Sequence, residues 1–447
     1  MNAKKVFVCL ALVGMLAFSG QAVAEFGTID AVPAATLLLP YFEVAPDKSV
    51  DTFFSVNNAS AAPELAHITV WTDQSIPVLD FDVFLTGYDV QSFSLHRVLI
   101  DGILPSTGSS TTVSNQGQFS LSNSSSPAPF PGCSNGTAGS GPPAYNPLSG
   151  TFLAVIEAAL TGQPIPAGAA SGLCAGADYG DGILRGYVTV DTVNECSQAF
   201  PNTPGYFVDG GLGIASNRNT IWGDWFIVDA LNNFAHGDTL VHVEAEETPS
   251  QAVCDFVPAG DNEPSTFYCR YSNGVDDREA LGSLYASRYL NGGPFTGGTD
   301  LLVWRDPLGN NAPGSCASRP FEYSLTQNQI VVFDEEENPI VAQRGPSGFE
   351  PEDENPFLFE TQRVAVGGPI GPTTAEPFGW IYLNLNGAEG NAAIHNQAWV
   401  VTVLSANGLY SVGYDAIQLN NLSAGDNNFD GWGDNVCLGN NGSIFSC

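Results

Sequence analysis

The chain has 447 residues, of which 13 are basic and 47 acidic, so its formal net charge is −34 at pH 7. A surface this negative repels nucleic acids and anionic lipid headgroups, which excludes both as expected partners and favours Ca²⁺ and cationic partners. Hydrophobic residues make up 43% of the sequence. That fraction is enough to build buried cores and excludes a globally disordered chain.

The N-terminus has the pattern of a secretory signal peptide. Lys4 and Lys5 precede an apolar run, Val6–Phe18, and Ala22-Val23-Ala24 matches the small-x-small cleavage rule. We expect residues 1–24 to be removed on export, with no membrane insertion of the product, which is secreted or periplasmic. The leader holds two of the bases and no acid, so its loss makes the net charge −36.

Strand signals dominate the rest of the sequence, and helical periodicity is almost absent. Short apolar or alternating runs are separated by turn-forming residues, in a chain with 49 Gly and 30 Pro. This pattern predicts an all-β sandwich or barrel. Two short helices are predicted, Phe152–Leu160 and Arg278–Tyr285. The predicted strands are Asp51–Val56, Ala66–Trp71, Leu79–Leu85, Gln91–Leu95, Leu184–Val190, Trp225–Val228, Leu240–Val243, Thr266–Tyr271, Leu301–Trp304, Gln329–Phe333, Gln362–Val366, Trp380–Leu385, Ala398–Leu404 and Tyr410–Ile417.

The length of the mature chain suggests two or three domains, at about 100–200 residues per domain. We predict a first domain over residues 25–250 and a second over residues 260–447, which ends in an acidic loop. Residues 106–181 lack strand patterning and are predicted to be a long loop insertion in the first domain. This insertion carries Cys133 and Cys174.

The order of the strands favours an internal duplication. Five runs of the first half have counterparts of similar type in the second half. They pair Tyr41–Val44 with Arg288–Leu290, Thr52–Val56 with Thr299–Val303, Ile68–Asp73 with Ile330–Glu335, Arg185–Val190 with Phe378–Leu383, and Leu240–Val243 with Trp399–Val403. The alternative to duplication is that strands with alternating patterns resemble each other by chance. Duplication implies two sandwiches of immunoglobulin-like (Ig-like) type.

Eight cysteines remain after the leader is removed, and an even number in an exported chain indicates disulfide bonds. Close spacing favours Cys254–Cys269 and Cys437–Cys447. A Cys133–Cys174 bond would staple the insertion to itself. No C-x-x-C pair is present, so the sequence gives no support to a zinc ribbon or a thioredoxin-like site.

No catalytic motif stands in the context that its chemistry needs. The Gly-x-Ser-x-Gly match at residues 132–136 lies in the insertion, without the strand and helix of a nucleophile elbow. His67 and His242 lie in strand runs and fit buried positions. Trp222-Gly223-Asp224-Trp225 places two indoles on opposite faces of a strand, where one could stack on a sugar and a core position is the simpler alternative. The acidic run Asp334–Glu337 fits a solvated hairpin tip.

A set of β-rich runs is spread along the mature chain, at Leu39–Val44, Leu79–Asp89, Arg185–Asp191, Gly298–Asp306 and Tyr410–Asp415. These runs resemble a family of uncharacterised secreted bacterial proteins. The resemblance covers most of the mature chain. It implies a secreted β-rich protein and carries no activity with it.

The end of the chain has the spacing of a calcium loop. Oxygens fall at alternate positions, with side chains from Asp426, Asn428, Asp430 and Asp434 and a backbone carbonyl from Trp432. The loop resembles a thrombospondin type 3 calcium half-repeat, which implies a Ca²⁺ ion bound by these residues. Cys437 stands where a related loop has a bidentate acid. An Asx-turn loop tied by a disulfide is the alternative.

These features together predict a secreted, non-enzymatic β-sandwich protein that acts by binding or by surface or matrix interaction. We expect its partner to be a protein or glycan at the cell surface and its cofactor to be Ca²⁺. One alternative is a carbohydrate-active hydrolase that uses an unrecognised pair of acids. The other is a structural component of an extracellular assembly.

Calcium binding at this loop can be tested by thermal unfolding. Extracellular Ca²⁺ modules have a Kd of about 10⁻⁴–10⁻³ M, so a fivefold excess over Kd stabilises the fold by about 1 kcal/mol and raises Tm by about 2–4 °C. Asp430→Ala should abolish this rise, and Asp334→Ala should keep it. An equal rise with a sodium salt of matched ionic strength would show that charge screening is the cause.

Overall fold

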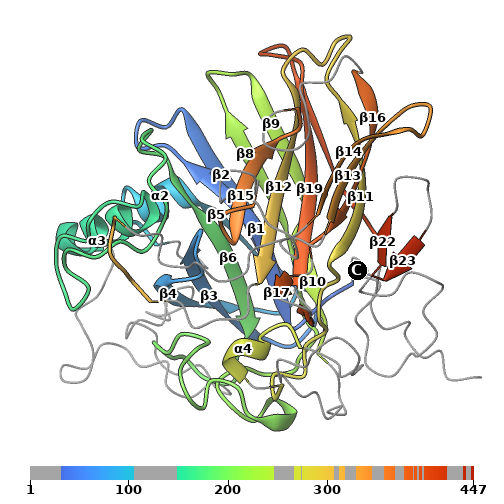
Figure 1. Ribbon diagram of the computed structural model, residues 1–447. Coiled ribbons are helices and arrows are strands. Elements are labelled where there is room, and N and C mark those ends of the chain that lie inside the picture. Colours follow the sequence, from blue (N-terminus) through green and yellow to red (C-terminus); the bar gives the residue numbers. More distant parts are fainter. Residues whose placement is uncertain are drawn as a thin grey trace, which may run out of the picture.

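Strands dominate the fold, which we describe from a computed structural model. The structure describes residues 32–104, 148–245, 266–272, 274–306, 312–317, 329–344, 357–367, 377–385, 387–389, 392–394, 397–419, 436–438 and 444–446. Its helices are α2 (Leu95–Leu99), α3 (Gly150–Leu160), α4 (Cys269–Ser272) and the 3-10 turn η1 (Asp209–Gly211) (Figure 1). None of the helices within these ranges is long and apolar enough to cross a membrane. The all-β prediction is confirmed.

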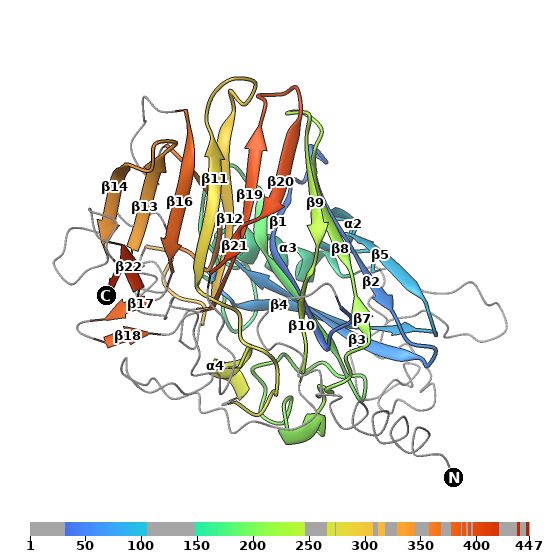
Figure 2. The same cartoon turned by 90° about the vertical axis from the view of Figure 1, so that its right-hand side faces the viewer.

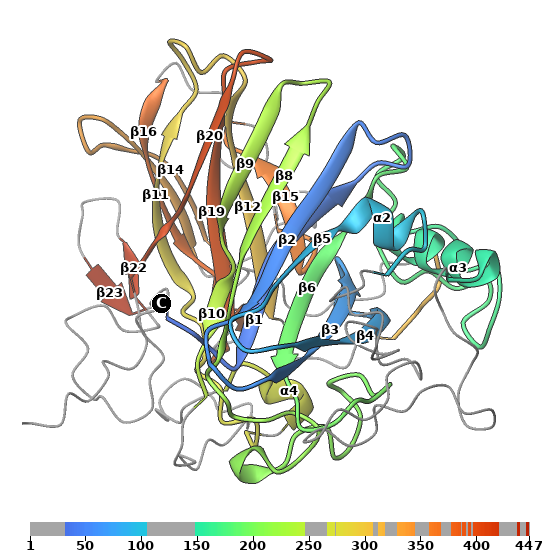
Figure 3. The ribbon, with the colours of Figure 1, turned by 180° about the vertical axis from the view of Figure 1, so that it is seen from behind.

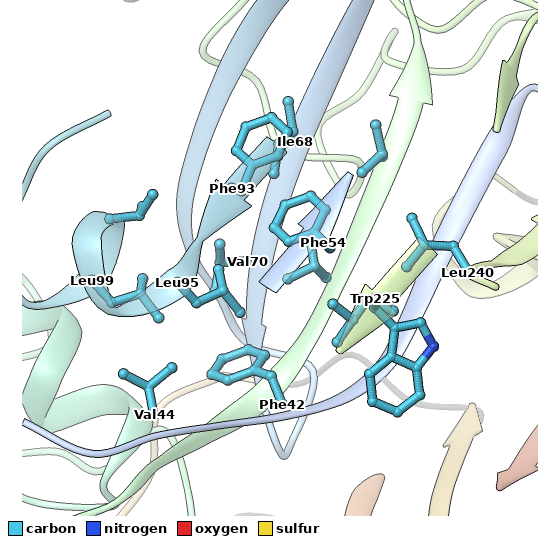
Figure 4. Close-up of a cluster of buried hydrophobic side chains, with 14 of the residues drawn as sticks. Phe42, Val44, Phe54, Ile68, Val70, Phe93, Leu95, Leu99, Trp225 and Leu240 are labelled. Carbon is cyan, nitrogen blue, oxygen red and sulfur yellow. The ribbon is translucent and has the colours of Figure 1, made fainter. Parts of the chain in front are cut away.

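The first part of the chain forms two antiparallel sheets that share one core. One sheet has the order β10-β1-β6-β3-β4 and the other the order β5-β2-β8-β9, with β7 beside β2 (Figure 2). Side chains from both sheets, among them Phe42, Phe54 and Ile68, meet in one buried cluster (Figure 4). The bounds are β1 (Thr36–Val44), β2 (Val50–Asn58), β3 (Glu64–Thr72), β4 (Pro77–Leu85), β5 (Val90–Ser94), β6 (Leu184–Thr192), β7 (Ile221–Trp222), β8 (Asp224–Asp229), β9 (Phe234–Thr239) and β10 (Val241–Val243).

The second part forms two further sheets, with the orders β14-β13-β16-β11-β21 and β15-β12-β19-β20, and the two small hairpins β17-β18 and β22-β23. Leu301, Ile330 and Ile381 contribute to a second buried cluster between its two large sheets. The bounds are β11 (Leu284–Leu290), β12 (Gly298–Asp306), β13 (Gln329–Asp334), β14 (Pro339–Arg344), β15 (Thr361–Ala365), β16 (Phe378–Asn384), β17 (Gly387–Glu389), β18 (Ala392–Ile394), β19 (Gln397–Ser405), β20 (Ser411–Asp415), β21 (Ile417–Gln418), β22 (Val436–Leu438) and β23 (Ile444–Ser446).

The two pairs of large sheets have the same strand order. The first six strands correspond to β11 to β16 in sequence, and β8, β9 and β10 correspond to β19, β20 and β21. Four of the five segment pairs expected from the sequence occupy matching positions. The fifth does not, because Leu240–Val243 contains β10, which corresponds to β21, whereas Trp399–Val403 lies in β19. The order also differs from that of an Ig sandwich, whose first two strands are neighbours in one sheet, because β1 and β2 lie in different sheets.

The two parts pack closely against each other. Successive side chains of a strand point to opposite faces. In β12, Leu301 and Val303 face the second core, whereas Leu302 joins the first core. The edge strand β20 lies beside β9, where Ser411 Oγ accepts from the Ala235 N–H (2.8 Å) and donates to the Ala235 carbonyl (2.6 Å). A side chain thus replaces part of a strand ladder at this seam.

Two local predictions are wrong. The predicted strand Thr266–Tyr271 contains the start of α4, and the predicted helix Arg278–Tyr285 is irregular until β11 begins at Leu284. Buried contacts outside the segment explain both cases. Tyr271 stacks on Trp71 (5.7 Å between ring centres), and the buried Arg278 donates to the backbone carbonyls of Asp276 and Ser216.

The insertion is tied to the second part of the chain. Cys174 forms a disulfide with Cys316, and Cys174 and Gly314 exchange both backbone hydrogen bonds at 2.9 Å. The predicted Cys133–Cys174 bond is therefore wrong, because Cys174 is bonded to a cysteine 142 residues further along the chain. Cys196 and Cys269 are also disulfide-bonded. The predicted helix Phe152–Leu160 is confirmed as part of α3, whose buried face closes one side of the first core.

Loss of the Cys174–Cys316 bond should destabilise the protein. The bond spans 142 residues, so it removes many conformations from the unfolded chain. Replacing both cysteines by serine should lower the free energy of unfolding by about 2–5 kcal/mol, measured by urea denaturation. The same comparison with both proteins fully reduced is the control. A difference that persists there would assign the loss to packing at the serines instead of to the cross-link.

Candidate binding face

The sheet β5-β2-β8-β9 presents one face to solvent (Figure 3). Alternation along the strands turns Phe54 and Trp225 into the core and leaves Phe53 and Phe226 outside. Phe53 is 40% exposed and Phe226 is 46% exposed. We call this surface the aromatic face. Its exposed apolar members are Phe53, Val90, Trp222, Phe226 and Val228.

Strand register places two of the rings directly opposite each other. Phe53 on β2 pairs with Phe226 on β8, and Phe226 pairs in turn with Gly237 on β9. A Cβ atom added to Gly237 would lie 2.1 Å from Cδ1 of Phe226. The ring of Phe226 therefore lies over the bare glycine backbone and shows its other side to solvent. An aromatic ring that covers a glycine in this way also supports an edge strand.

The third ring is Trp222, on the short strand β7. Trp222 pairs with Asn57 and is 42% exposed, whereas Trp225 is 1% exposed. The predicted placement of the two indoles on opposite faces is confirmed. Gly223 between them is required by close packing, because a Cβ atom there would lie 2.1 Å from the carbonyl oxygen of Ser55.

A polar row separates Trp222 from the Phe53–Phe226 pair. Ser55 Oγ donates to Asp224 Oδ1 (2.6 Å) and accepts from Asn57 Nδ2 (2.9 Å), which fixes these side chains within the sheet. Ser92 pairs with Ser55 and Thr239 pairs with Asp224, and both hydroxyl residues are exposed. The face thus offers flat apolar rings on either side of hydroxyl and carboxylate oxygens.

A buried ionic cluster lies on the other sheet of the first part. His67 on β3 is fully buried, with Nδ1 at 2.6 Å from Asp82 Oδ1 and Nε2 at 3.8 Å from Asp80 Oδ2. Burial alone would lower the pKa of His67, but the carboxylates of Asp82, Asp80 and Asp191 outweigh it and raise the pKa to about 9. Because the imidazole has no exposed surface, we assign it a structural role. His242 is also buried, as predicted.

The residues that the sequence nominated for metal binding lie outside the described part of the chain. They are Asp426, Asn428, Asp430, Trp432 and Asp434, and the signal peptide at residues 1–24 and the motif at residues 132–136 are outside it as well. Among the described residues, no three His, Cys, Asp or Glu side chains lie close enough to hold a metal ion. Asp334 closes the β13–β14 hairpin through bonds from Glu336 and Asn338, so the predicted hairpin tip is confirmed.

Comparison with protein-family models, with curated proteins and with solved structures finds no match to this chain.

The His67 cluster predicts how stability depends on pH. The pKa of His67 is about 9 in the folded protein and about 6.5 in an unfolded chain. Its stabilising contribution is therefore complete below pH 6.5 and is lost as pH rises through 9. In urea denaturation at pH 6 and pH 9, His67→Gln should remove on the order of 1–3 kcal/mol of the pH dependence of wild type. If the free energy of unfolding changed equally between pH 6 and pH 9 in the two proteins, that result would contradict a charged His67.

Proposed function

We propose that this chain is a secreted, non-enzymatic β-sandwich protein whose aromatic face binds a partner at the cell surface or in the surrounding matrix. The observation that carries this proposal is the joint exposure of Phe53, Trp222 and Phe226 on one face of a single sheet. Single exposed apolar residues are ordinary on protein surfaces, whereas grouped ones mark interaction sites. The large negative charge keeps such a protein soluble despite this face.

The second part of the chain supports this proposal. Its sheet β15-β12-β19-β20 occupies the same place in the strand order as the sheet with the aromatic face. There, the corresponding outer face is buried against the first part through Leu302, Val401 and Val403. We propose that the two parts arose by duplication of one sandwich. In that case, the same face serves contact within the molecule in one copy and contact with a partner in the other.

A hydrolase is the second candidate, and one acid favours it. Asp415 on β20 lies across the seam from β9, which carries Asp238. Burial, and then the carboxylate of Asp238, raise the pKa of Asp415 to about 7, although Trp399 Nε1 donates to its Oδ1 at 3.2 Å. A protonated acid beside a second carboxylate is what general-acid cleavage of a glycoside needs. Release of reducing sugar by wild type, abolished by Asp415→Asn, would favour this candidate.

A structural role in an extracellular assembly is the third candidate. It would join copies of the chain through the same face, because that face has the largest exposed rings among the described strands. Sedimentation velocity of the purified protein separates it from the others, because a chain that assembles with itself sediments faster as its concentration rises, whereas a chain that binds only a different partner stays monomeric when it is alone.

The proposed function predicts that the aromatic face determines how much of the protein is retained on envelope and matrix material. The double variant Phe53→Thr/Trp222→Thr removes two rings, keeps Phe226 over Gly237, and introduces residues that suit strands. It should bind to envelope and matrix material from the secreting cells at least about tenfold more weakly than wild type, a loss of roughly 1.4 kcal/mol. The measurement is the retained fraction of purified, labelled protein.

A control variant removes two apolar side chains that are more exposed than Phe53 and Trp222 and lie off the strands of the aromatic face. Leu212 is 80% exposed and Leu231 is 79% exposed, and neither lies on the strands of the aromatic face. Leu212→Thr/Leu231→Thr should bind as wild type does. Equal retention of all three proteins, with unchanged Tm, would show that the aromatic face is not the binding surface.

A further inference from the structure

We propose that the aromatic face binds a neutral, β-linked polysaccharide, an inference that rests on the proposed function and names its partner. The first argument is the way the rings are presented. Phe226 lies over the bare backbone of Gly237 and shows one side to solvent, on a sheet whose neighbouring strands hold it in place. A pyranose ring carries its C–H groups on two flat faces. It therefore suits a ring lying flush on a surface, whereas protein hot spots insert into packed pockets.

The second argument is the order of apolar and polar rows. Asp224 lies two positions from both Trp222 and Phe226, so the two rings are roughly 13 Å apart along the strand direction. The Ser92–Ser55–Asp224–Thr239 row runs between them. An extended sugar chain that lies on the sheet and runs parallel to the strands would stack on both rings. Its hydroxyl groups would fall over the oxygens of that row.

The third argument is the supply of acceptors. Asp224 binds Ser55 through Oδ1, and no hydrogen bond to its Oδ2 is found in the described part of the chain. Asn57 is 2% exposed and donates to Ser55 Oγ, so it supports the polar row from beneath, and the acceptor that a ligand could reach is the carboxylate of Asp224. Sugar hydroxyls are donors, so they match acceptors that the fold fixes in place and leaves available.

The fourth argument is charge. The rows of this face carry Asp51 and Asp224 but no lysine or arginine, and the whole chain has a net charge of −34. Polyuronates and sulfated glycans are therefore repelled. A cationic protein would complement the negative charge of this face, but the centre of a protein interface is depleted of carboxylates such as Asp224. A neutral glycan satisfies both the rings and the acceptors without a charge of its own.

The experiment measures binding of purified full-length protein to microcrystalline cellulose, colloidal chitin and β-mannan, with alginate as the anionic control. Wild type should bind at least one neutral polymer and not alginate. Phe53→Thr/Trp222→Thr should weaken that binding at least tenfold, and Leu212→Thr/Leu231→Thr should leave it unchanged. Asp224→Asn keeps the acceptor for Ser55, and it should weaken binding severalfold. Binding should change less than twofold between 0.05 and 1 M NaCl, because no ion pair forms.

Absence of binding to all three neutral polymers would overturn the glycan assignment. The proposed function would survive that result if retention on cell material still depended on Phe53 and Trp222. Loss of that retention after protease treatment of the material would then identify a protein partner. A concentration-dependent dimer that Phe53→Thr/Trp222→Thr dissociates would instead assign the face to a second copy of this chain. If retention did not depend on the two rings, both proposals would fail.

Discussion

The fold depends on β12 and β19, the two central strands of the sheet β15-β12-β19-β20, which are buried on both faces. Val303 and Val400 pack into the core of the second part, whereas Leu302 and Val401 pack into the core of the first. A strand with apolar side chains on both faces cannot stay soluble unless both faces are covered. The first core is therefore completed only when the second part is in place. Two sandwiches with the same strand order thus become one packed body, in which only one of the two equivalent faces is free.

Buried arginines reinforce the junction between the two parts. Arg278 is 2% exposed, lies 5.2 Å from the ring of Phe207 and 3.6 Å from Asp191, and binds Thr36 through Nε. Arg270 lies 3.0 Å from Asp306 and 3.3 Å from Glu360, and although burial acts to lower the pKa of its guanidinium, these two carboxylates outweigh that effect and raise the pKa above its usual range. Removing one partner of such a pair leaves a buried charge and costs about 3–5 kcal/mol.

Sequence patterns predicted the strands well, because their alternation is local. The patterns failed where contacts between residues far apart in the sequence determine the backbone conformation or the disulfide pairing. Tyr271 and Arg278 take irregular or helical backbone because Trp71 and Ser216, far away in the chain, hold their side chains. The Cys174–Cys316 bond depends on how two distant loops meet. The aromatic face was only partly visible in the sequence. The adjacent Phe53 and Phe54 are chemically the same, and only the register with β8 shows which of them is exposed.

The chemical difference between the two equivalent faces indicates what each is for. The buried one carries Leu302, Val401 and Val403, branched aliphatic side chains that interlock in a dry core. The free one carries flat rings and, between them, hydrogen-bonded Ser55 and Asp224. At the edges of the buried face, Asp300 and Asp415 lie opposite Val403 and Val401, and Arg363 and Trp399 offset the hydration that these two carboxylates lose. The carboxylate of the free face, Asp224, stays near water. The same topology therefore supports permanent packing in one half. In the other half it leaves exposed the aromatic face on which the proposed binding function rests.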